Sequence, residues 1–220
     1  PATDVIGEDM DIIASQAASI GYPLMLKASW GGGGRGMRPI NAPQELEAKV
    51  REGQREAEAA FGNGEGYLEK MITRARHVEV QILGDKQGEI YHLWERDCSV
   101  QRRNQKVVER APAPYLNQEQ RESVCELAKR IASTVGYECA GTVEFLMDMD
   151  TDGFYFIEVN PRIQVEHTVT EEVTGIDIVR AQILIAEGKT LAEATGVNSQ
   201  AEVQLDGHAL QCGITTEDPL

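Results

Sequence analysis

TVEFLMDMDTDGFYFIEVNPRIQVEH, residues 142–167, contains two apolar runs separated by a short polar segment. Asp-Thr-Asp-Gly at 150–153 is a strong turn signal between those runs. The pattern therefore predicts an antiparallel hairpin made of strands 142–149 and 154–160. A dense group of polar side chains follows directly on the second strand, where a strand end often carries functional groups.

Two glutamates on this hairpin are candidate metal ligands. Side chains alternate along a strand, so Glu144 and Leu146 share one face of the first strand. On the second strand, Phe156, Glu158 and Asn160 share a face. If the two faces coincide, the glutamates meet and stay ionised only with a compensating cation, and their oxygens suit Mg²⁺ or Mn²⁺ bridging nucleotide phosphates. The alternative is that both glutamates are solvated on an exposed face.

The segment NPRIQVEH, residues 160–167, brings amide, guanidinium, carboxylate and imidazole groups into eight residues. Such a density of polar chemistry at a strand end suggests a reaction centre. Arg162 offers a planar fork for a carboxylate, bicarbonate or phosphate, and Glu166 has the chemistry of a general base toward a bound acid. A surface loop stabilised by local ion pairs is the alternative.

A glycine-rich run, KASWGGGGRG at 27–36, joins a cationic strand end to a loop with almost no side chains. Backbone N–H groups in such a loop approach an anion closely, so the run predicts a cover over phosphates. It is not a P-loop, because the terminal Gly-Lys-Ser/Thr is missing, and the spacing of a dinucleotide-binding loop is absent. A flexible linker is the alternative.

Net charge argues against a broad anion-binding surface. The chain carries 36 acidic and 21 basic residues, a formal charge of −15, so any anion site has to be a local pocket. Residues 96–106 concentrate four cations and are the candidate for that pocket. A solvated charged loop is the alternative, and nucleic-acid binding is disfavoured because the run lacks stacking aromatics.

Three polar residues alternate with apolar ones in a further predicted strand. His77, Glu79 and Gln81 share one strand face, with valine and isoleucine between them. A lone histidine on a strand is usually structural. Two polar neighbours facing the same way leave a ligand role open beside the structural one.

The remaining patterns predict two units. The first 70 residues read as a small α/β unit, and a sheet-rich unit begins at Tyr67, with a linker near 70–76. Helices are predicted at 9–20, 42–60, 117–136 and 170–188, and further strands at 22–28, 67–72, 77–83, 89–95 and 208–214.

Length and composition indicate a folded α/β or α+β protein with a substantial core, since 41% of the 220 residues are hydrophobic. There is no apolar run long enough for a membrane span and no signal peptide at the start. Four dispersed cysteines indicate reduced thiols in a cytoplasmic protein rather than a zinc site. The first residue is not Met, and the chain stops directly after a predicted strand, as expected of a piece of a longer protein.

Taken together, these motifs resemble the biotin carboxylases, a family with the ATP-grasp fold. The resemblance rests on GGGGRGM within 27–37, EK at 69–70, RHVEVQILGD at 76–85, ERDCSVQRRNQKVVE at 95–109, AGTVEFL at 140–146 and FIEVNPRIQVEHTVTE at 156–171. It spans nearly the whole chain. HALQC at 208–212 and TTEDP at 215–219 look more like pyruvate carboxylases than acetyl-CoA or propionyl-CoA carboxylases.

The resemblance implies an α/β (α+β) chain with the ATP-grasp fold. Residues 1–70 would form its small lid subdomain, and residues 71–220 its antiparallel-sheet core with the incomplete start of a C-terminal subdomain. The implied enzyme is a ligase that carboxylates biotin with ATP and bicarbonate through carboxyphosphate. In pyruvate carboxylase this is the first half-reaction on the way to oxaloacetate, in gluconeogenesis and anaplerosis.

The resemblance also implies partners. Biotin would be attached to a separate carrier domain, and the full-length protein would be a homo-oligomer without a nucleic-acid or membrane partner. Because the family's N-terminal α/β domain and a later arginine that steadies the biotin enolate would lie outside these residues, the residues alone are expected to show little or no biotin carboxylation.

Residue roles are implied by position. ATP would be bound by Lys27, Gly32, Gly33, Gly34, Met37, Glu69, Lys70, Ile72, His77, Gln101, Asn104 and Leu146. Mg²⁺ or Mn²⁺ would be held by Glu144, Glu158 and Asn160. Bicarbonate would contact Lys106, Arg162, Gln164 and Val165, with Glu166 as its base and Lys106 and Arg162 as further catalytic residues.

The chain departs from the family's pattern at three positions. Asn104 stands where many relatives have His, Pro161 replaces a commoner small hydroxyl residue, and Gly213 stands where Arg is expected. These changes put a phosphate contact and local salt bridging in doubt. Other hypotheses are part of an acyl-CoA carboxylase, a carbamoyl-phosphate-type or amino-acid ligase, and a nucleotide-binding module without turnover. The RIQVEH and QRRNQK segments argue against the second of these.

Overall fold

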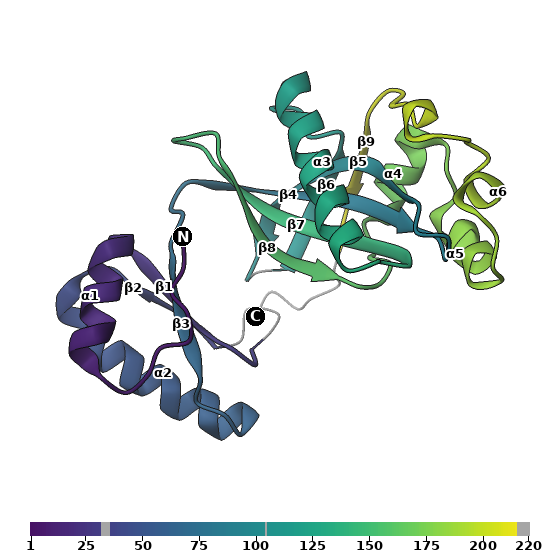
Figure 1. Cartoon of the computed structure of the whole chain (residues 1–220). Coiled ribbons are helices and arrows are strands. Elements are labelled where there is room, and N and C mark those ends of the chain that lie inside the picture. The colour runs from purple at the N-terminus through teal and green to yellow at the C-terminus, as the bar shows by residue number, and fades with distance from the viewer. Residues whose placement is uncertain (32–35, 104, 215–220) are drawn as a thin grey trace. The chain divides into compact units, whose positions relative to one another are not determined.

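The structure is a computed structural model that describes residues 1–31, 36–103 and 105–214. The chain divides into two compact units, Pro1–Thr73 and Arg74–Leu220 (Figure 1). In the described residues the first unit contains a three-stranded sheet with two α-helices, and the second a six-stranded antiparallel sheet with helices against both faces. None of the described helices is long and apolar enough to cross a membrane.

The sheet of the first unit has the order β2-β1-β3, and both of its neighbouring pairs are antiparallel. Its strands are β1 (Leu24–Ala28), β2 (Met37–Ile40) and β3 (Gly66–Lys70), and its helices are α1 (Met10–Ile20) and α2 (Leu46–Phe61), the latter preceded by a 3₁₀ turn at Pro43–Glu45. Alternate residues of β1, Leu24 and Leu26, pack with Ile13 of α1 and Val50 of α2. Both helices therefore cover the same face of the sheet.

Helix α1 confirms the helix predicted at 9–20. Asp9 caps its start, because the Asp9 carboxylate accepts a hydrogen bond from the backbone N–H of Asp11 at 2.9 Å. Gly21 ends it with a φ of 84°, a value that glycine adopts without strain. The strand predicted at 67–72 was placed in the wrong unit: β3 pairs along its length with β1, so it completes the sheet of the first unit.

The second unit is built on one sheet with the order β8-β7-β4-β5-β6-β9, all pairs antiparallel. Its strands are β4 (Ala75–Gly84), β5 (Ile90–Arg102), β6 (Gln105–Ala111), β7 (Cys139–Asp148), β8 (Phe154–Asn160) and β9 (Ala209–Cys212). The central strand pair, β4 with β5, was predicted from residues 77–83 and 89–95, but β5 is longer and runs through the basic segment to Arg102. Strand β6 was missed because lysine, glutamate and arginine interrupt its apolar residues.

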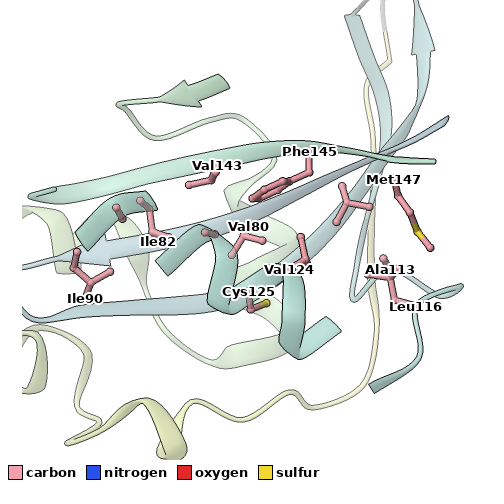
Figure 2. Close-up of a cluster of buried hydrophobic side chains, with 13 residues drawn as sticks. Val80, Ile82, Ile90, Ala113, Leu116, Val124, Cys125, Val143, Phe145 and Met147 are labelled. Carbon is pink, nitrogen blue, oxygen red and sulfur yellow. The ribbon is translucent and has the colours of Figure 1, made fainter. Parts of the chain in front are cut away.

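One face of this sheet carries the main apolar core. Val78, Val80 and Ile82 of β4 and Phe145 of β7 pack against helix α3 (Gln118–Thr134), which lies across the strands (Figure 1). Figure 2 shows these side chains gathered between the strands and the helix that carries Val124 and Cys125. Because side chains alternate, the opposite face carries Glu79, Gln81 and Leu83.

Helices α4 (His167–Thr174), α5 (Ile178–Ala186) and α6 (Leu191–Thr195) belong to that opposite face. The apolar side chains of α5 and α6 pack with Leu83 and Leu93, while α4 lies beside the polar residues described below. A single helix was predicted at 170–188, and that prediction is wrong. Gly175 ends α4 in the left-handed conformation, and Asp177 caps α5, so the chain turns between two separate helices.

Hairpin β7–β8 confirms the predicted turn, but its register contains a bulge. Glu144 pairs with Glu158, whereas the next residue, Phe145, pairs with Phe156, so that Ile157 is the extra residue. An extra residue reverses the alternation of side chains beyond it. The prediction that Phe156 shares the face of Glu158 is therefore wrong: its ring lies edge-on to Phe145, with centroids 6.3 Å apart.

We predict that acid destabilises the second unit through His92. This histidine is buried beside the Trp94 ring, and burial, together with the nearby Lys129 charge, lowers its pKa to about 4. Below the ordinary pKa of about 6.5 the unfolded chain binds a proton that the folded chain does not, so stability is present at neutral pH and is lost as pH falls toward 4. The expected loss between about pH 7 and pH 5 is about 2 kcal/mol.

Chemical unfolding at several pH values measures this effect in the protein and in His92→Gln. The variant is expected to lose less stability on acidification, although Glu126, whose carboxylate lies 4.0 Å from the His92 ring, is unchanged. Identical pH slopes for the two proteins would contradict the assignment to His92.

Candidate functional site

The two glutamates of the hairpin face each other across β7 and β8. Glu144 and Glu158 are directly paired, and Asn160 bridges them, because its side-chain amide donates to Glu144 Oε1 at 2.9 Å and to Glu158 Oε1 at 3.4 Å. The two predicted faces therefore coincide at these residues. Glu144 is buried, whereas Glu158 is exposed, so the pair lies at the border between the sheet interior and solvent.

Lys106 lies at the centre of a group of carboxylates. Its ammonium is 2.7 Å from Glu144 Oε1 and 2.7 Å from Glu166 Oε1, and it also forms an ion pair with Glu79. A bulge in the β5–β6 register at Val107 places Lys106 on this face together with Glu109. Burial alone would lower the pKa of Lys106, but Glu79 and Glu144 outweigh it and hold that pKa above its usual value.

Arg96 is the second cation of the site, and it is fully buried. It pairs across the ladder with Glu79, whose Oε1 accepts from Arg96 Nε at 2.8 Å. The same guanidinium donates to Gln81 Oε1 at 2.8 Å and to Thr170 Oγ1, on α4, at 2.9 Å. Sequence patterns named Arg96 only as one of the four cations of residues 96–106, because its burial and its partners depend on strand pairing.

These cations control the ionisation of the buried glutamates. Burial would raise the pKa of Glu79, but the Arg96 and Lys106 charges hold it below the usual value. Burial would likewise raise the pKa of Glu144, and the neighbouring His77 ring and Lys106 ammonium lower it well below its usual range. Both carboxylates are therefore ionised at neutral pH and depend on their cationic neighbours.

The segment after β8 reaches the same cluster at two of its predicted residues. Gln164 is buried and donates from Nε2 to Glu144 Oε1 at 3.0 Å, and Glu166 forms the ion pair with Lys106. Arg162 is exposed and donates to Asn160 Oδ1 at 3.5 Å, at the limit of a hydrogen bond. The Val165 side chain is 78% exposed and lies outside the cluster.

Three other predicted residues lie beside this cluster. His77 pairs across the ladder with Leu146, and its Nε2 is 3.0 Å from Glu144 Oε2. Gln101 Nε2 lies 3.0 Å from His77 Nδ1 and donates to the backbone carbonyl of Cys98 at 2.9 Å. His77, Gln101 and Leu146 thus form one edge of the same surface. Asn104 lies outside the described residues.

The first unit holds its own set of predicted nucleotide contacts. Lys27 forms an ion pair with Glu69 on the neighbouring strand, and Lys27 pairs in register with Met37. Lys70 turns instead toward the end of α1, where its ammonium donates to the carbonyls of Gly21 and Tyr22 at 3.0 Å each. The half-buried Ile72 follows β3. Gly32, Gly33 and Gly34 lie outside the described residues.

Candidate metal ligands within the described residues extend beyond the predicted set. His77, Glu79 and Glu144 offer ligand atoms within 4.8 Å of one another, as do Glu79, Cys98 and Glu166. Burial raises the pKa of the Cys98 thiol well above its usual value, so Cys98 is a neutral neighbour rather than a thiolate ligand. Oxygen ligands from Glu144, Glu158 and Asn160 fit a hard divalent cation better.

Comparisons with known proteins identify the family of this chain. Residues 1–194 match the family model described as the carbamoyl-phosphate synthase L chain, ATP binding domain. The chain belongs to this family. It is 56% identical over 203 residues to pyruvate carboxylase 1 of Caenorhabditis elegans, which covers 92% of this chain and 17% of that protein. The chain thus spans about a fifth of the length of the curated relatives it matches.

Solved structures give the same family and fold. A Rhizobium etli pyruvate carboxylase superposes with a TM-score of 0.89 at 62% identity, covering all of this chain and 19% of that chain. The biotin carboxylase domain of Hydrogenobacter thermophilus 2-oxoglutarate carboxylase also superposes at 0.89, with 48% identity, covering all of this chain and 47% of that one. The resemblance to biotin carboxylases and the predicted mixed helix and antiparallel-sheet fold are confirmed.

We predict that Glu79 contributes far more to stability than Glu158 does. Glu79→Gln leaves Arg96 and Lys106 without a shared counter-charge, and breaking a buried ion pair in this way costs about 3 to 5 kcal/mol. Glu158→Gln changes an exposed side chain, so its effect is expected within about 0.5 kcal/mol.

Urea unfolding of both variants beside the unchanged protein measures the difference. The two substitutions are chemically identical, so each is the other's control. Equal losses of stability would contradict the central place given to Glu79.

Proposed function

We propose that this chain is the ATP- and bicarbonate-handling part of a biotin carboxylase within a pyruvate carboxylase. The observation that carries the proposal is the contact of Lys106 with both Glu144 and Glu166, beside Gln164. This contact brings together a cation that can bind an anion, Lys106, a carboxylate that can bind a metal, Glu144, and a carboxylate that can act as a general base, Glu166. The H. thermophilus domain, which shares this fold, was solved with MgADP and bicarbonate and supports the same ligands here.

Glu166 is the proposed base. A bicarbonate ion beside Lys106 and Arg162 loses its proton to the Glu166 carboxylate, and the resulting oxyanion attacks the γ-phosphorus of ATP. The bond from that phosphorus to the bridging oxygen breaks, which gives ADP and carboxyphosphate. Carboxyphosphate then releases phosphate and CO₂; the released phosphate takes the proton from N1 of biotin, and N1 forms the new bond to the carbon of CO₂.

Glu144, Glu158 and Asn160 are the proposed ligands of Mg²⁺ or Mn²⁺. Their positions support this role, because the paired glutamates offer hard oxygen atoms at one place on the sheet, and Asn160, whose amide nitrogen now contacts both, would offer its oxygen there if the amide turned over. Such an ion would neutralise part of the negative charge on the nucleotide phosphates. Glu144 would exchange contacts with Lys106 or Gln164 for the metal, which leaves that ammonium and amide available to an anion.

The proposed nucleotide contacts come from both units. Lys27, Met37, Glu69, Lys70, Ile72 and the glycines 32–34 are the proposed contacts of the first unit; His77, Gln101, Asn104 and Leu146 are those of the second. Residues 1–70 are the proposed lid, whose role would be to exclude water from carboxyphosphate, and residues 71–220 are the proposed core.

The carboxyl acceptor and the partners are part of the same proposal. Similarity to pyruvate carboxylases supports pyruvate as the acceptor, a biotin-bearing carrier domain as the partner and a homo-oligomer as the assembly. An equally good superposition on a 2-oxoglutarate carboxylase supports a half-reaction that carboxylases with different carboxyl acceptors have in common.

The compartment is a separate part of the proposal. The free cysteines Cys98, Cys125, Cys139 and Cys212 support a reducing compartment such as the cytoplasm.

ADP release by the full-length protein that contains this chain tests the proposal. With MgATP present, bicarbonate is expected to stimulate ADP release, and pyruvate is expected to be carboxylated. Glu166→Gln removes the base and Glu158→Gln a metal ligand, so each is expected to lower bicarbonate-dependent release by about 100-fold or more.

The Glu158→Gln variant provides its own control, since it keeps its stability while losing turnover. ADP release that is indifferent to bicarbonate in the unchanged protein would overturn the proposed function. Near-normal rates in both variants would overturn the assignment of the site.

A further inference from the structure

Arg96 connects several elements that surround the site. Its side chain is fully buried, and its hydrogen bonds reach β4 at Glu79 and Gln81 and helix α4 at Thr170. We propose that Arg96 is the positioning residue for bicarbonate: it touches no substrate and holds the groups that do. The inference rests on the proposed function of this site.

Arg96 acts on Lys106 through Glu79. The carboxylate of Glu79 is shared, since Oε1 accepts from Arg96 at 2.8 Å and Oε2 faces the Lys106 ammonium. Because Arg96 holds Oε1, the orientation of the whole Glu79 carboxylate is fixed. Its Oε2 then attracts the Lys106 ammonium to a position beside Glu144 and Glu166. Without the Arg96 guanidinium, the Glu79 carboxylate can rotate, and the Lys106 ammonium is then no longer held in its position.

A second connection runs from Arg96 to the segment after β8. Its Nη2 lies 3.5 Å from Gln164 Oε1, while the other end of that amide donates to Glu144 at 3.0 Å. Thr170 adds an anchor one turn into α4, the helix that follows directly on Glu166. Arg96 therefore sets the positions of Gln164 and Glu166 as well as that of Lys106.

Only the guanidinium shape makes all these contacts. Arginine offers five N–H donors in a rigid plane, and here Nε, Nη1 and Nη2 together reach acceptors on β4, β7 and α4. Lysine keeps the buried charge opposite Glu79 but has a single flexible ammonium. Arg96→Lys thus removes the geometry and retains the charge.

The same strand offers a matched control on the other face of the sheet. Glu95, next to Arg96, is buried and forms an ion pair with the partly buried Arg121 of α3, with Nε to Oε1 at 2.8 Å. Arg121 also donates to the carbonyls of Ala113 and Leu116, at 3.1 and 3.3 Å. Arg121→Lys therefore disturbs a partly buried arginine whose hydrogen bonds, within the described residues, reach no residue of the site.

The test compares Arg96→Lys with Arg121→Lys in the full-length protein, measuring ADP release against bicarbonate and against MgATP separately. Arg96→Lys is expected to lower kcat/KM for bicarbonate by about tenfold or more and to leave the KM for MgATP within about threefold. Arg121→Lys is expected to lower the melting temperature and to leave both kinetic parameters within about threefold.

An unchanged kcat/KM for bicarbonate in folded Arg96→Lys would overturn the inference, as would the same kinetic loss in Arg121→Lys. If Arg96→Lys does not fold, Thr170→Val decides, since it removes one acceptor of Arg96 at nearly constant volume. It is expected to lower kcat/KM for bicarbonate by about threefold or more without changing the KM for MgATP, and no change would overturn the inference. An unchanged protein without bicarbonate stimulation would overturn the proposed function, and this inference with it.

Discussion

The carboxylate of Glu79 is buried in the sheet between two cations, and the polar face of the second unit depends on that arrangement. Transferring an ion from water into a protein interior costs on the order of several kcal/mol unless neighbouring groups compensate for the lost hydration. Compensation requires β5 to lie beside β4 in the register that pairs Glu79 with Arg96, and it requires the bulge that turns Lys106 to this face. The ion pair and the sheet register therefore support each other.

Charge around this pair is not balanced. Three carboxylates, Glu79, Glu144 and Glu166, share the two cations Arg96 and Lys106, which leaves one excess negative charge. A divalent cation at Glu144 and Glu158 or a proton on Glu166 reduces this excess. Either change makes Lys106 more available to an anion, so the same few side chains suit both metal-bound phosphate and bicarbonate.

Local patterns predicted the elements whose signals are complete within a few residues. The hairpin of β7 and β8, its Asp-Thr-Asp-Gly turn, helix α1 and helix α3 follow from turn residues, caps and periodicity in short windows. Strand β6 and the break at Gly175 were missed, because charged residues hide the apolar alternation in one and a single glycine decides the other. Glu79 was noted beside His77 and Arg96 as one of the four cations of residues 96–106, but their pairing across the ladder was not predicted.

By itself, the sequence determined the family, the carboxylates of the hairpin and the motif that carries Glu166, because each is written in contiguous residues. Only the tertiary structure decided which of these groups meet. Lys106 reaches Glu144 through the three strand pairings that join β6 to β7 and a bulge, and Arg96 joins the site through burial between strands and α4. Registers and bulges are set by contacts between distant segments, and a shift of one residue moves a side chain to the other face of the sheet.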